Sequence, residues 1–263
     1  MKGLAERVRG FAPVLGTLVH ECDTPGMPAI LEASGLDFAM YDMEHSGFGW
    51  DSVRRAMSYA RGMNLAALVR VPTNEYSVIA RALDVRAAGV MVPFVRSRAD
   101  ADAIVAAAKY APAGRRGVAA GIAHDDFRMG DTGGVLAEAN RGTLLIAQIE
   151  DRDGLEHCGA IADAPGIDVV FIGHYDLSCS LGVPGDVGHP AVMEAERRIV
   201  SACRRAGKPA GRVVYDVEGL TAALQAGFTF LAFASDIGVL RAGFTAARAH
   251  FAAVAGTARR EGD

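Results

Sequence analysis

The sequence contains few of the residues that several common kinds of active site require. Only three lysines occur in 263 residues, and none follows an apolar run that could form a strand, although Lys208 precedes one. This scarcity disfavours Schiff-base chemistry, which needs a lysine amine at the reacting centre. The four cysteines are far apart and form no CxxC pair, so we expect reduced thiols and neither a zinc site nor a disulfide framework. The remaining lysines are Lys2 and Lys109, and the cysteines are Cys22, Cys158, Cys179 and Cys203.

Long apolar runs are also missing. None reaches the roughly 18 residues that a membrane-spanning helix requires, and residues 1–9 lack the apolar core of a secretion signal. The charge is nearly balanced, with 27 basic and 31 acidic residues and a net charge of -4. Neither a nucleic acid nor a membrane is therefore an expected partner, and we expect the protein to be cytoplasmic.

Short apolar runs that alternate with helical segments fill most of the chain. Hydrophobic residues make up 51% of the sequence, and eight runs rich in Val, Ile and Leu lack the polar alternation of a half-exposed strand. Repeated units of strand and helix predict one (β/α)8 TIM barrel over residues 1–263. An open doubly wound sheet is the alternative, disfavoured because no early glycine-rich turn is present. The expected strands are Val14–Val19, Phe38–Asp42, Ala66–Val71, Gly89–Phe94, Leu144–Glu150, Val169–Gly173, Ala210–Val214 and Phe230–Ala234.

Two segments depart from this repeat. Ala111–Gly142 is rich in glycine and follows the fourth strand, so we expect a long functional loop over the barrel mouth. Ile237–Thr257 has the pattern of a helix, which either closes the barrel or packs on a neighbouring subunit.

Polar residues gather where the expected strands end. The active site of such a barrel lies at the carboxyl ends of its strands, so these residues would meet on one rim. This convergence is stronger support for an enzyme than any one residue. The rim residues are Asp42, Glu44, His45, Arg70, Pro93, Gln148, Glu150, Gly173, His174, Tyr175, Asp176, Ser235 and Asp236.

Glu150 and Asp176 are the candidate metal ligands. Both follow buried strands, and their hard carboxylate oxygens suit Mg²⁺ or Mn²⁺. Two alternatives remain open on spacing alone: Asp176 could cap a helix, and Glu150 could pair with Arg152 or another arginine.

His45, Arg70 and Asp84 are further candidates. A histidine that Asp42 orients would be a general base, although a loop histidine paired with a carboxylate has the same pattern. Arg70 ends an apolar strand, so it needs an anionic partner, and spacing slightly favours a protein carboxylate over a substrate oxyanion. Asp84 lies in a helical stretch, where a solvated charge is the simpler interpretation.

A set of short motifs in a fixed order resembles the HpcH/HpaI family of class II, metal-dependent pyruvate aldolases. The resemblance covers about residues 15–235. The family members that the chain resembles include 4-hydroxy-2-oxoheptanedioate and 2-dehydro-3-deoxyglucarate aldolases. The matching segments are Asp42–His45, Leu68–Pro72, Gly89–Pro93, Arg116–Val118, Gln148–Glu150, Phe171–Ser178, Gly188–Pro190 and Ser235–Asp236.

The resemblance implies a role for most of the rim. Glu150 and Asp176 would bind a divalent metal (Mg²⁺ or Mn²⁺, with Co²⁺ as a further option), and pyruvate would chelate that metal. The backbone around Gly173 and Tyr175 would hold the substrate carboxylate, and Gln148 would orient the substrate or a water molecule.

The catalytic groups also follow from the resemblance. Arg70 would stabilise the enolate oxygen, and His45, oriented by Asp42, would move protons through a water molecule. Asp84 would reach the site of an adjacent subunit. The family implies a homohexamer, a trimer of dimers with exchanged C-terminal helices, that cleaves 4-hydroxy-2-oxo acids to pyruvate and an aldehyde.

The chain also departs from the family pattern, mainly at the pocket rim and the subunit contact. Leu18 stands where many members have Trp, and Arg86 replaces a glycine. His174 and Tyr175 replace the usual Pro-Ala, so the identity of the acceptor aldehyde is in doubt. After His45, where glycine is common in the family, this chain has Ser46-Gly47.

Other functions remain as alternatives. An oxaloacetate-type decarboxylase, or a related lyase or synthase, would use the same enolate. A CoA-ester lyase lacks a basic groove, and a phosphate-binding isomerase would meet repulsion from Asp236. A non-catalytic barrel would have no reason to keep every charge of the rim.

Overall fold

A closed barrel of eight parallel strands forms the centre of the molecule. The computed structural model describes residues 3–128 and 130–258, and neighbouring strands pair in chain order until β8 closes on β1. This topology confirms the predicted (β/α)8 TIM barrel. The strands are β1 (Val14–Val19), β2 (Phe38–Asp42), β3 (Ala66–Arg70), β4 (Gly89–Val92), β5 (Leu144–Ile149), β6 (Val169–Ile172), β7 (Ala210–Val214) and β8 (Phe228–Ser235).

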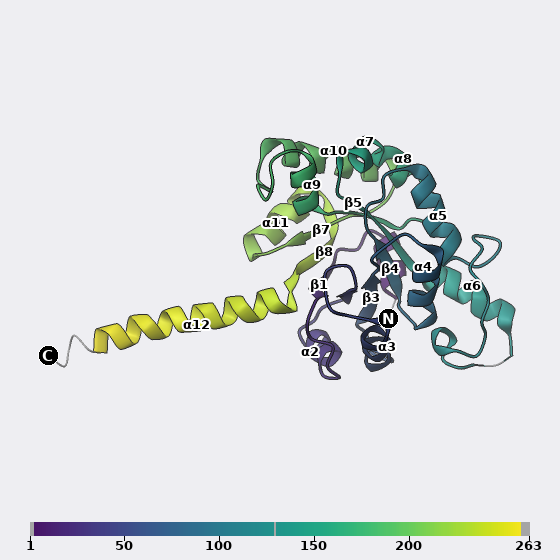
Figure 1. The fold of residues 1–263 in the computed structure, drawn as a ribbon, viewed down its shortest axis with the longest axis horizontal. Coiled ribbons are helices and arrows are strands. Elements are labelled where there is room, and N and C mark those ends of the chain that lie inside the picture. The colour runs from purple at the N-terminus through teal and green to yellow at the C-terminus, as the bar shows by residue number, and fades with distance from the viewer. Residues whose placement is uncertain (1–2, 129, 259–263) are drawn as a thin grey trace.

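Helices surround the barrel (Figure 1). Their apolar faces pack against the outward side chains of the strands, such as Val69 and Ile172. The helices are α1 (Leu4–Arg9), α2 (Met27–Ala33), α3 (Trp50–Tyr59), α4 (Tyr76–Asp84), α5 (Arg98–Ala108), η1 (Ala123–Asp125), α6 (Thr132–Gly142), α7 (Arg152–Glu156), α8 (Cys158–Ala162), α9 (His174–Ser180), α10 (Pro190–Ala206), α11 (Val217–Ala226) and α12 (Asp236–Ala258).

The inward face of the strands changes from apolar to polar along the barrel. Successive side chains of a strand alternate between its two faces, so every second residue shares the interior. Phe38, Met40 and Phe171 fill the core, where Phe38 stacks on Phe230 with ring centroids 4.4 Å apart, and α1 packs against this interior core. The same alternation carries the polar residues of the strand ends into the mouth.

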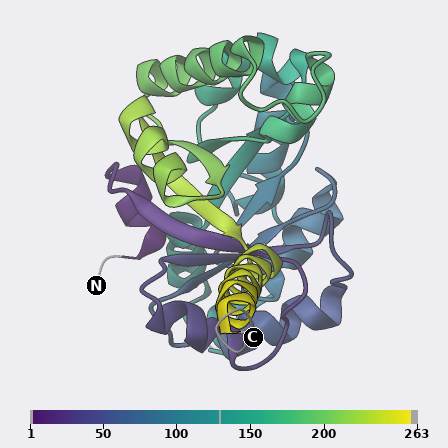
Figure 2. The same cartoon turned by 90° about the vertical axis from the view of Figure 1, so that its left-hand side faces the viewer.

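Helix α12 leaves the barrel and projects into solvent, which Figures 1 and 2 show from two directions. Beyond its first turns its described side chains are exposed, including the large apolar residues Leu240, Phe244, Phe251 and Val254. The helix confirms the element expected over 237–257, and its exchange between subunits stays a prediction. Among the described residues, no helix is long and apolar enough to cross a membrane.

Candidate active site

A cavity of about 380 Å³ opens at the carboxyl ends of the strands. Asp42 and Glu150, which are almost fully buried, belong to the strand ends beside this cavity. The structure therefore gathers most of the predicted rim in one place. The predicted rim residues that line the cavity are His45, Arg70, Gln148, Gly173, His174, Tyr175 and Asp176.

A buried ion pair joins the ends of β2 and β3. Asp42 and Arg70 are partners in the register of these strands, so their side chains leave the sheet side by side. Arg70 donates from Nε to Asp42 Oδ1 at 2.9 Å and from Nη2 to Oδ2 at 2.6 Å, while its Nη1 lies 3.2 Å from Glu44 Oε2. Arg70 thus has the protein carboxylate partner that spacing favoured.

These contacts shape the charges of the carboxyl groups. Burial by itself would raise the pKa of Asp42, but hydrogen bonds from His20 and Arg70 outweigh it and hold that pKa well below its usual range. Burial raises the pKa of Glu44 against the pull of Arg70. Asp42 is therefore a fixed charge, and Glu44 is a carboxylate whose ionisation is penalised.

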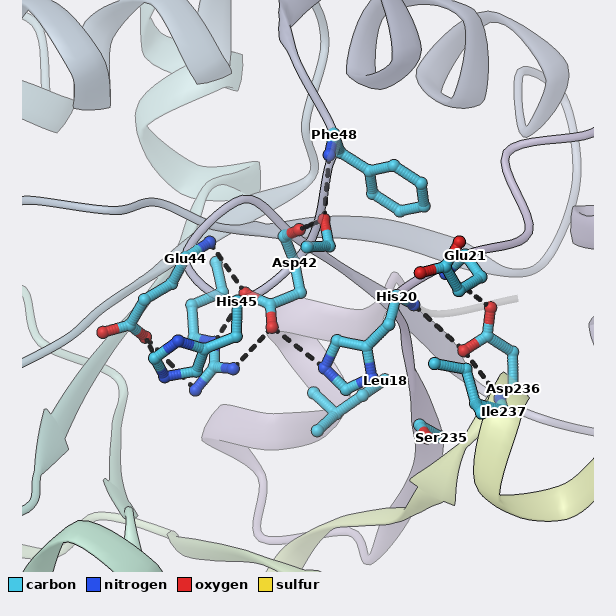
Figure 3. A network of polar contacts seen from close by, with 12 residues as sticks. Leu18, His20, Glu21, Asp42, Glu44, His45, Phe48, Ser235, Asp236 and Ile237 are labelled. Atoms are coloured by element: carbon cyan, nitrogen blue, oxygen red, sulfur yellow. Dashed lines mark hydrogen bonds and ion pairs between the residues drawn. The ribbon is translucent and has the colours of Figure 1, made fainter. Parts of the chain in front are cut away.

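The structure corrects one predicted contact, because Asp42 orients His20 and not His45. The Nε2 atom of His20 lies 2.9 Å from Asp42 Oδ2, whereas His45 is mostly exposed and lies 3.8 Å from Glu44. Figure 3 shows Asp42 between His20 on one side and Glu44 with His45 on the other. Both histidines line the cavity. The role of His45 stays a prediction, and His20 is a second candidate base.

Asp236 fixes the loop that carries His20. Its carboxylate accepts backbone hydrogen bonds from His20 (3.0 Å), Glu21 (3.0 Å) and Cys22 (2.8 Å), which are visible in part in Figure 3. It also accepts one from Ile237, in the first turn of α12. Burial would raise the pKa of Asp236, but these donors lower it. Asp236 therefore ties the loop after β1 to α12 and positions His20, and it is not among the residues that line the cavity.

Glu150, on the opposite side of the mouth, forms no salt bridge with a cationic side chain among the described residues, although the charge of the buried Arg70 acts to lower its pKa. Its Oε1 accepts the Phe94 N–H at 2.9 Å, and its Oε2 accepts from Gln148 Nε2 at 2.7 Å. Arg152, the alternative partner, instead donates to Ser180. Burial, with the charges of Glu44 and Asp176 nearby, raises the pKa of Glu150 to about 8 although Phe94 acts against this.

Gly173 leaves the space that Glu150 occupies. A Cβ at this position would lie 2.3 Å from Glu150 Oε2 and 2.8 Å from Gln148 Nε2, so no other residue fits without a shift. The amide of Gly173 donates to the Ile149 carbonyl. Gly173 therefore contributes space, and the predicted backbone donor for a substrate carboxylate falls to Tyr175 and its neighbours.

Asp176 lies in the first turn of α9 and is exposed to the cavity. The cap position belongs to Gly173, and no side chain caps this helix, so the capping alternative for Asp176 is not realised. Among residues 3–128 and 130–258, no three His, Cys, Asp or Glu side chains are grouped to hold a metal ion.

The residues present nevertheless fit a divalent cation. Among the described residues, Glu150 is a buried carboxylate without a salt bridge, and Gln148 has a buried Oε1 without a hydrogen-bond partner. Asp176 is a second carboxylate at the cavity. A cation between them would offset the charge that burial penalises, and two carboxylates would leave coordination positions for substrate.

Three aromatic rings form one wall of the cavity, and we call His174, Tyr175 and Tyr215 the aromatic wall. Ring centroids lie 5.1 Å apart between His174 and Tyr175, 5.8 Å between His174 and Tyr215, and 5.9 Å between the tyrosines. Burial and the charge of Arg212 lower the pKa of His174 to about 4, so its ring is neutral at pH 7.

Asp84 lies outside this chain's cavity. Its carboxylate accepts from Arg116 Nη2 at 2.6 Å, at the end of α4. The nearby Arg86 has a φ of 83°, which explains why a glycine suits this position. The role of Asp84 in a neighbouring subunit stays a prediction.

The region expected as a long loop over the mouth is different in the structure. Ala111–Gly142 contains η1 and α6, and none of its described residues lines the cavity. The segment was expected over the mouth only because it follows the fourth strand. In the structure, α6 packs against α1 at the amino end of the barrel.

Sequence reasoning missed three residues that shape the site. His20 directly follows β1, and Tyr215 directly follows β7, so the rule that found the other rim residues would also have found these. Phe94 gave no such signal, because its contribution is a backbone N–H.

Comparisons with known proteins agree with this geometry. The family model "HpcH/HpaI aldolase/citrate lyase" matches residues 19–242. The chain belongs to this family. A 5-keto-4-deoxy-D-glucarate aldolase of Klebsiella pneumoniae is 34% identical over 212 residues, which cover 81% of this chain and 82% of the relative. These matches confirm the family and the aldolase class predicted from the sequence.

Solved structures share the fold. An HpcH/HpaI aldolase from Desulfitobacterium hafniense superposes with a TM-score of 0.90 at 28% identity, covering 95% of this chain and 97% of that one. The citrate synthase SbnG superposes with a TM-score of 0.85 at 25% identity, covering 97% and 99%. The same barrel therefore occurs in a protein named as an aldolase and in a protein named as a citrate synthase.

Proposed function

We propose that this chain is a divalent-metal-dependent aldolase that reversibly cleaves 4-hydroxy-2-oxo acids to pyruvate and an aldehyde. The observation that carries the proposal is the group of Asp176 and Arg70, which line one cavity, and the buried Glu150 beside it, whose pKa both of them influence. Glu150 forms no salt bridge among the described residues, and Arg70 supplies positive charge in the same mouth.

Glu150 and Asp176 would hold Mg²⁺ or Mn²⁺, hard cations that prefer carboxylate oxygens. When bound, the cation supplies Lewis-acid polarisation of the keto group, which lowers the energy of the pyruvate enolate. Gln148 keeps Glu150 in place through its 2.7 Å hydrogen bond. Gly173 keeps the space beside these two side chains open.

Arg70 stabilises the negative charge that develops on the substrate. Cleavage moves the C3–C4 bonding electrons into a C2–C3 enolate, and the aldehyde carbon leaves with its oxygen. Asp42 and Glu44 hold the guanidinium in a fixed position, so it needs no reorganisation as the charge forms.

Proton transfer falls to the two histidines that line the cavity, His45 and His20. One of them accepts the C4 hydroxyl proton, and a proton is returned to C3 to give pyruvate. His20 has the carboxylate orientation expected of a general base, through Asp42 at 2.9 Å. His45 has the place that the family motif predicts. Separate His20→Gln and His45→Gln variants, compared for pyruvate release, assign the two roles.

We also infer a homohexamer in which α12 packs on a neighbouring chain and Asp84 reaches the neighbouring site. The exposed apolar side chains Leu240, Phe244 and Phe251 on the projecting helix support this assembly. Light scattering on the purified protein tests it, with a mass about six times the 27.5 kDa of one chain as the expected result. A monomer would contradict it.

The decisive experiment strips the protein with a chelator and measures pyruvate release from 4-hydroxy-2-oxo acids, with and without Mn²⁺ or Mg²⁺. Metal should restore cleavage in the wild type but not in Glu150→Gln. The variant should also bind Mn²⁺ more weakly in a calorimetric titration. Glu194→Gln, at an exposed glutamate of α10, is the matched control and should behave as the wild type.

An oxaloacetate-type decarboxylase or synthase is the second candidate. The likeness to the citrate synthase SbnG favours it. Release of CO₂ and pyruvate from oxaloacetate, with no cleavage of 4-hydroxy-2-oxo acids, would replace the aldolase proposal with this one.

A further inference from the structure

His174 is the buried side chain beside the cavity whose polar atoms are least satisfied. It is 2% exposed, and neither Nδ1 nor Nε2 has a hydrogen-bond partner among the described residues. The ring nevertheless lines the cavity. A buried polar group is normally hydrogen-bonded, so this ring is placed to meet a polar group of a ligand.

Tyr175 and Tyr215 extend this surface to the mouth of the cavity. They are 49% and 50% exposed, and their rings pack edge to face at a centroid distance of 5.9 Å. One comes from α9 and the other directly follows β7, so two elements present a continuous aromatic surface. Such a surface favours flat apolar groups, which stack on aromatic faces and edges.

The remaining charges disfavour a second carboxylate in the cavity. Arg70 is the only arginine or lysine among the described residues that line it, and Nε, Nη1 and Nη2 all face Asp42 or Glu44. His20 is likewise paired with Asp42, His45 lies beside Glu44, and Glu21 adds negative charge. With the proposed metal taken up by Glu150, Asp176 and pyruvate, a carboxylate on the aldehyde would meet no arginine or lysine without a carboxylate partner among the described lining residues, which costs free energy.

We propose that the aromatic wall binds the aldehyde and selects an uncharged aldehyde with an aromatic or similarly flat group, with a hydroxyl of that group bonded to His174. The inference rests on the proposed aldolase function. It differs from the substrate in the relative's name, 5-keto-4-deoxy-D-glucarate, which is a diacid.

The first test measures aldol addition of pyruvate to three aldehydes with the metal-loaded enzyme. Benzaldehyde represents the aromatic class, succinic semialdehyde the carboxylated class, and acetaldehyde is the small uncharged reference. We expect kcat/KM for benzaldehyde to exceed that for succinic semialdehyde by about tenfold or more. A preference for succinic semialdehyde would overturn the inference.

Variants of the wall give the second test. Tyr215→Ala should lower kcat/KM for benzaldehyde about tenfold and leave that for acetaldehyde within about twofold, and Tyr215→Phe, which keeps the ring, should restore most of the loss. His174→Phe should abolish any preference for hydroxybenzaldehydes over benzaldehyde. Equal losses for all aldehydes in Tyr215→Ala would mean a structural role and would contradict the proposal.

A separate readout distinguishes failure of this inference from failure of the proposed function. Exchange of the pyruvate methyl protons in D₂O, followed by NMR without any aldehyde, reports enolate formation alone. Exchange together with a preference for carboxylated aldehydes would overturn only the acceptor assignment. No exchange in the metal-loaded protein would overturn the proposed function, and the acceptor assignment with it.

Discussion

The two sides of the barrel mouth differ in how their charges are balanced. On the β2–β3 side, Asp42 is bound by Arg70 and His20, and Glu44 is paired with Arg70, although Glu44 Oε2 has no hydrogen-bond partner among the described residues. On the β5–β6 side, the hydrogen bonds to Glu150 come from amide donors, and in the same part of the chain Gln148 Oε1 and both ring nitrogens of His174 have no hydrogen-bond partner. The carboxylates of the first side are therefore paired within the protein, whereas the second side would gain its partners from the cation and substrate that we propose.

This difference assigns distinct physical tasks to side chains that look alike in the sequence. Asp42 and Glu150 are both buried carboxylates at strand ends, yet the pKa of Asp42 is lowered and that of Glu150 is raised to about 8. We call the β2–β3 side the balanced side and the β5–β6 side the binding side. In the proposed mechanism the balanced side holds the guanidinium of Arg70, and the binding side holds the cation and the substrate. Variants on each side test whether stability and binding divide in this way.

The largest expected effect on stability lies on the balanced side. Asp42→Asn removes the bidentate partner of a buried guanidinium, so the free energy of unfolding in urea should fall by about 3 kcal/mol. Glu44→Gln is the matched control. Because burial already penalises the charge of Glu44, its replacement should lower the free energy of unfolding by no more than about 1 kcal/mol. Equal losses of unfolding free energy in the two variants would mean that the ion pair of Arg70 with Asp42 stabilises the fold no more than its pair with Glu44.

The largest effect on the binding side should concern activity. Gly173→Ala introduces a Cβ 2.3 Å from Glu150 Oε2, which must displace the carboxylate. Pyruvate release should fall about a hundredfold, because small displacements of reacting groups are costly. The control is Gly47→Ala, in the loop after β2, where a Cβ meets nothing within 4 Å. Full activity in Gly173→Ala would show that Glu150 is not held where the structure has it.

Much of this arrangement follows from the sequence, because the alternation of side chains between the two faces of a strand is set by neighbouring residues. Ala210–Val214 has the predicted bounds, and alternation along β2 and β3 puts Asp42 and Arg70 on the same inner face. The family motifs then assign them to one site.

The remaining features depend on distances that no local pattern encodes. His20 and His45 both follow strand ends, and only the three-dimensional packing brings His20 to Asp42. Helix α6 was missed because Gly133, Gly134 and Gly142 lower its helix propensity, which its packing in the folded chain outweighs. The φ of 51° at Phe94 contradicts the usual preference of an aromatic residue.

The contribution of the balanced side to stability should also depend on pH in a distinct way. The folded state lowers the pKa of Asp42 below its ordinary 3.8, so the unfolded chain takes up a proton first as the pH falls. The stability that Asp42 contributes is complete well above pH 3.8 and is lost below it, by about 1.4 kcal/mol per pH unit. Urea unfolding of the wild type and Asp42→Asn between pH 6 and pH 3 measures this. The gap between them should narrow only at the acid end, and a constant gap would contradict the ion-pair account.

The smallest effect concerns the backbone that holds Glu150. Phe94 adopts a φ of 51° and donates its N–H to Glu150, so the strain of a left-handed residue supports the binding side. Phe94→Gly relieves that strain and keeps the N–H, whereas Phe94→Ala keeps the strain, and both lose the ring contact with Arg96. Gly should therefore be more stable than Ala by about 1 kcal/mol, the reverse of their usual order, because glycine has no penalty at positive φ. Both variants should retain metal-dependent activity, since the amide and not the ring positions the carboxylate. If Ala were the more stable of the two, the strain at Phe94 would not be real, and Glu150 would need another explanation for its position.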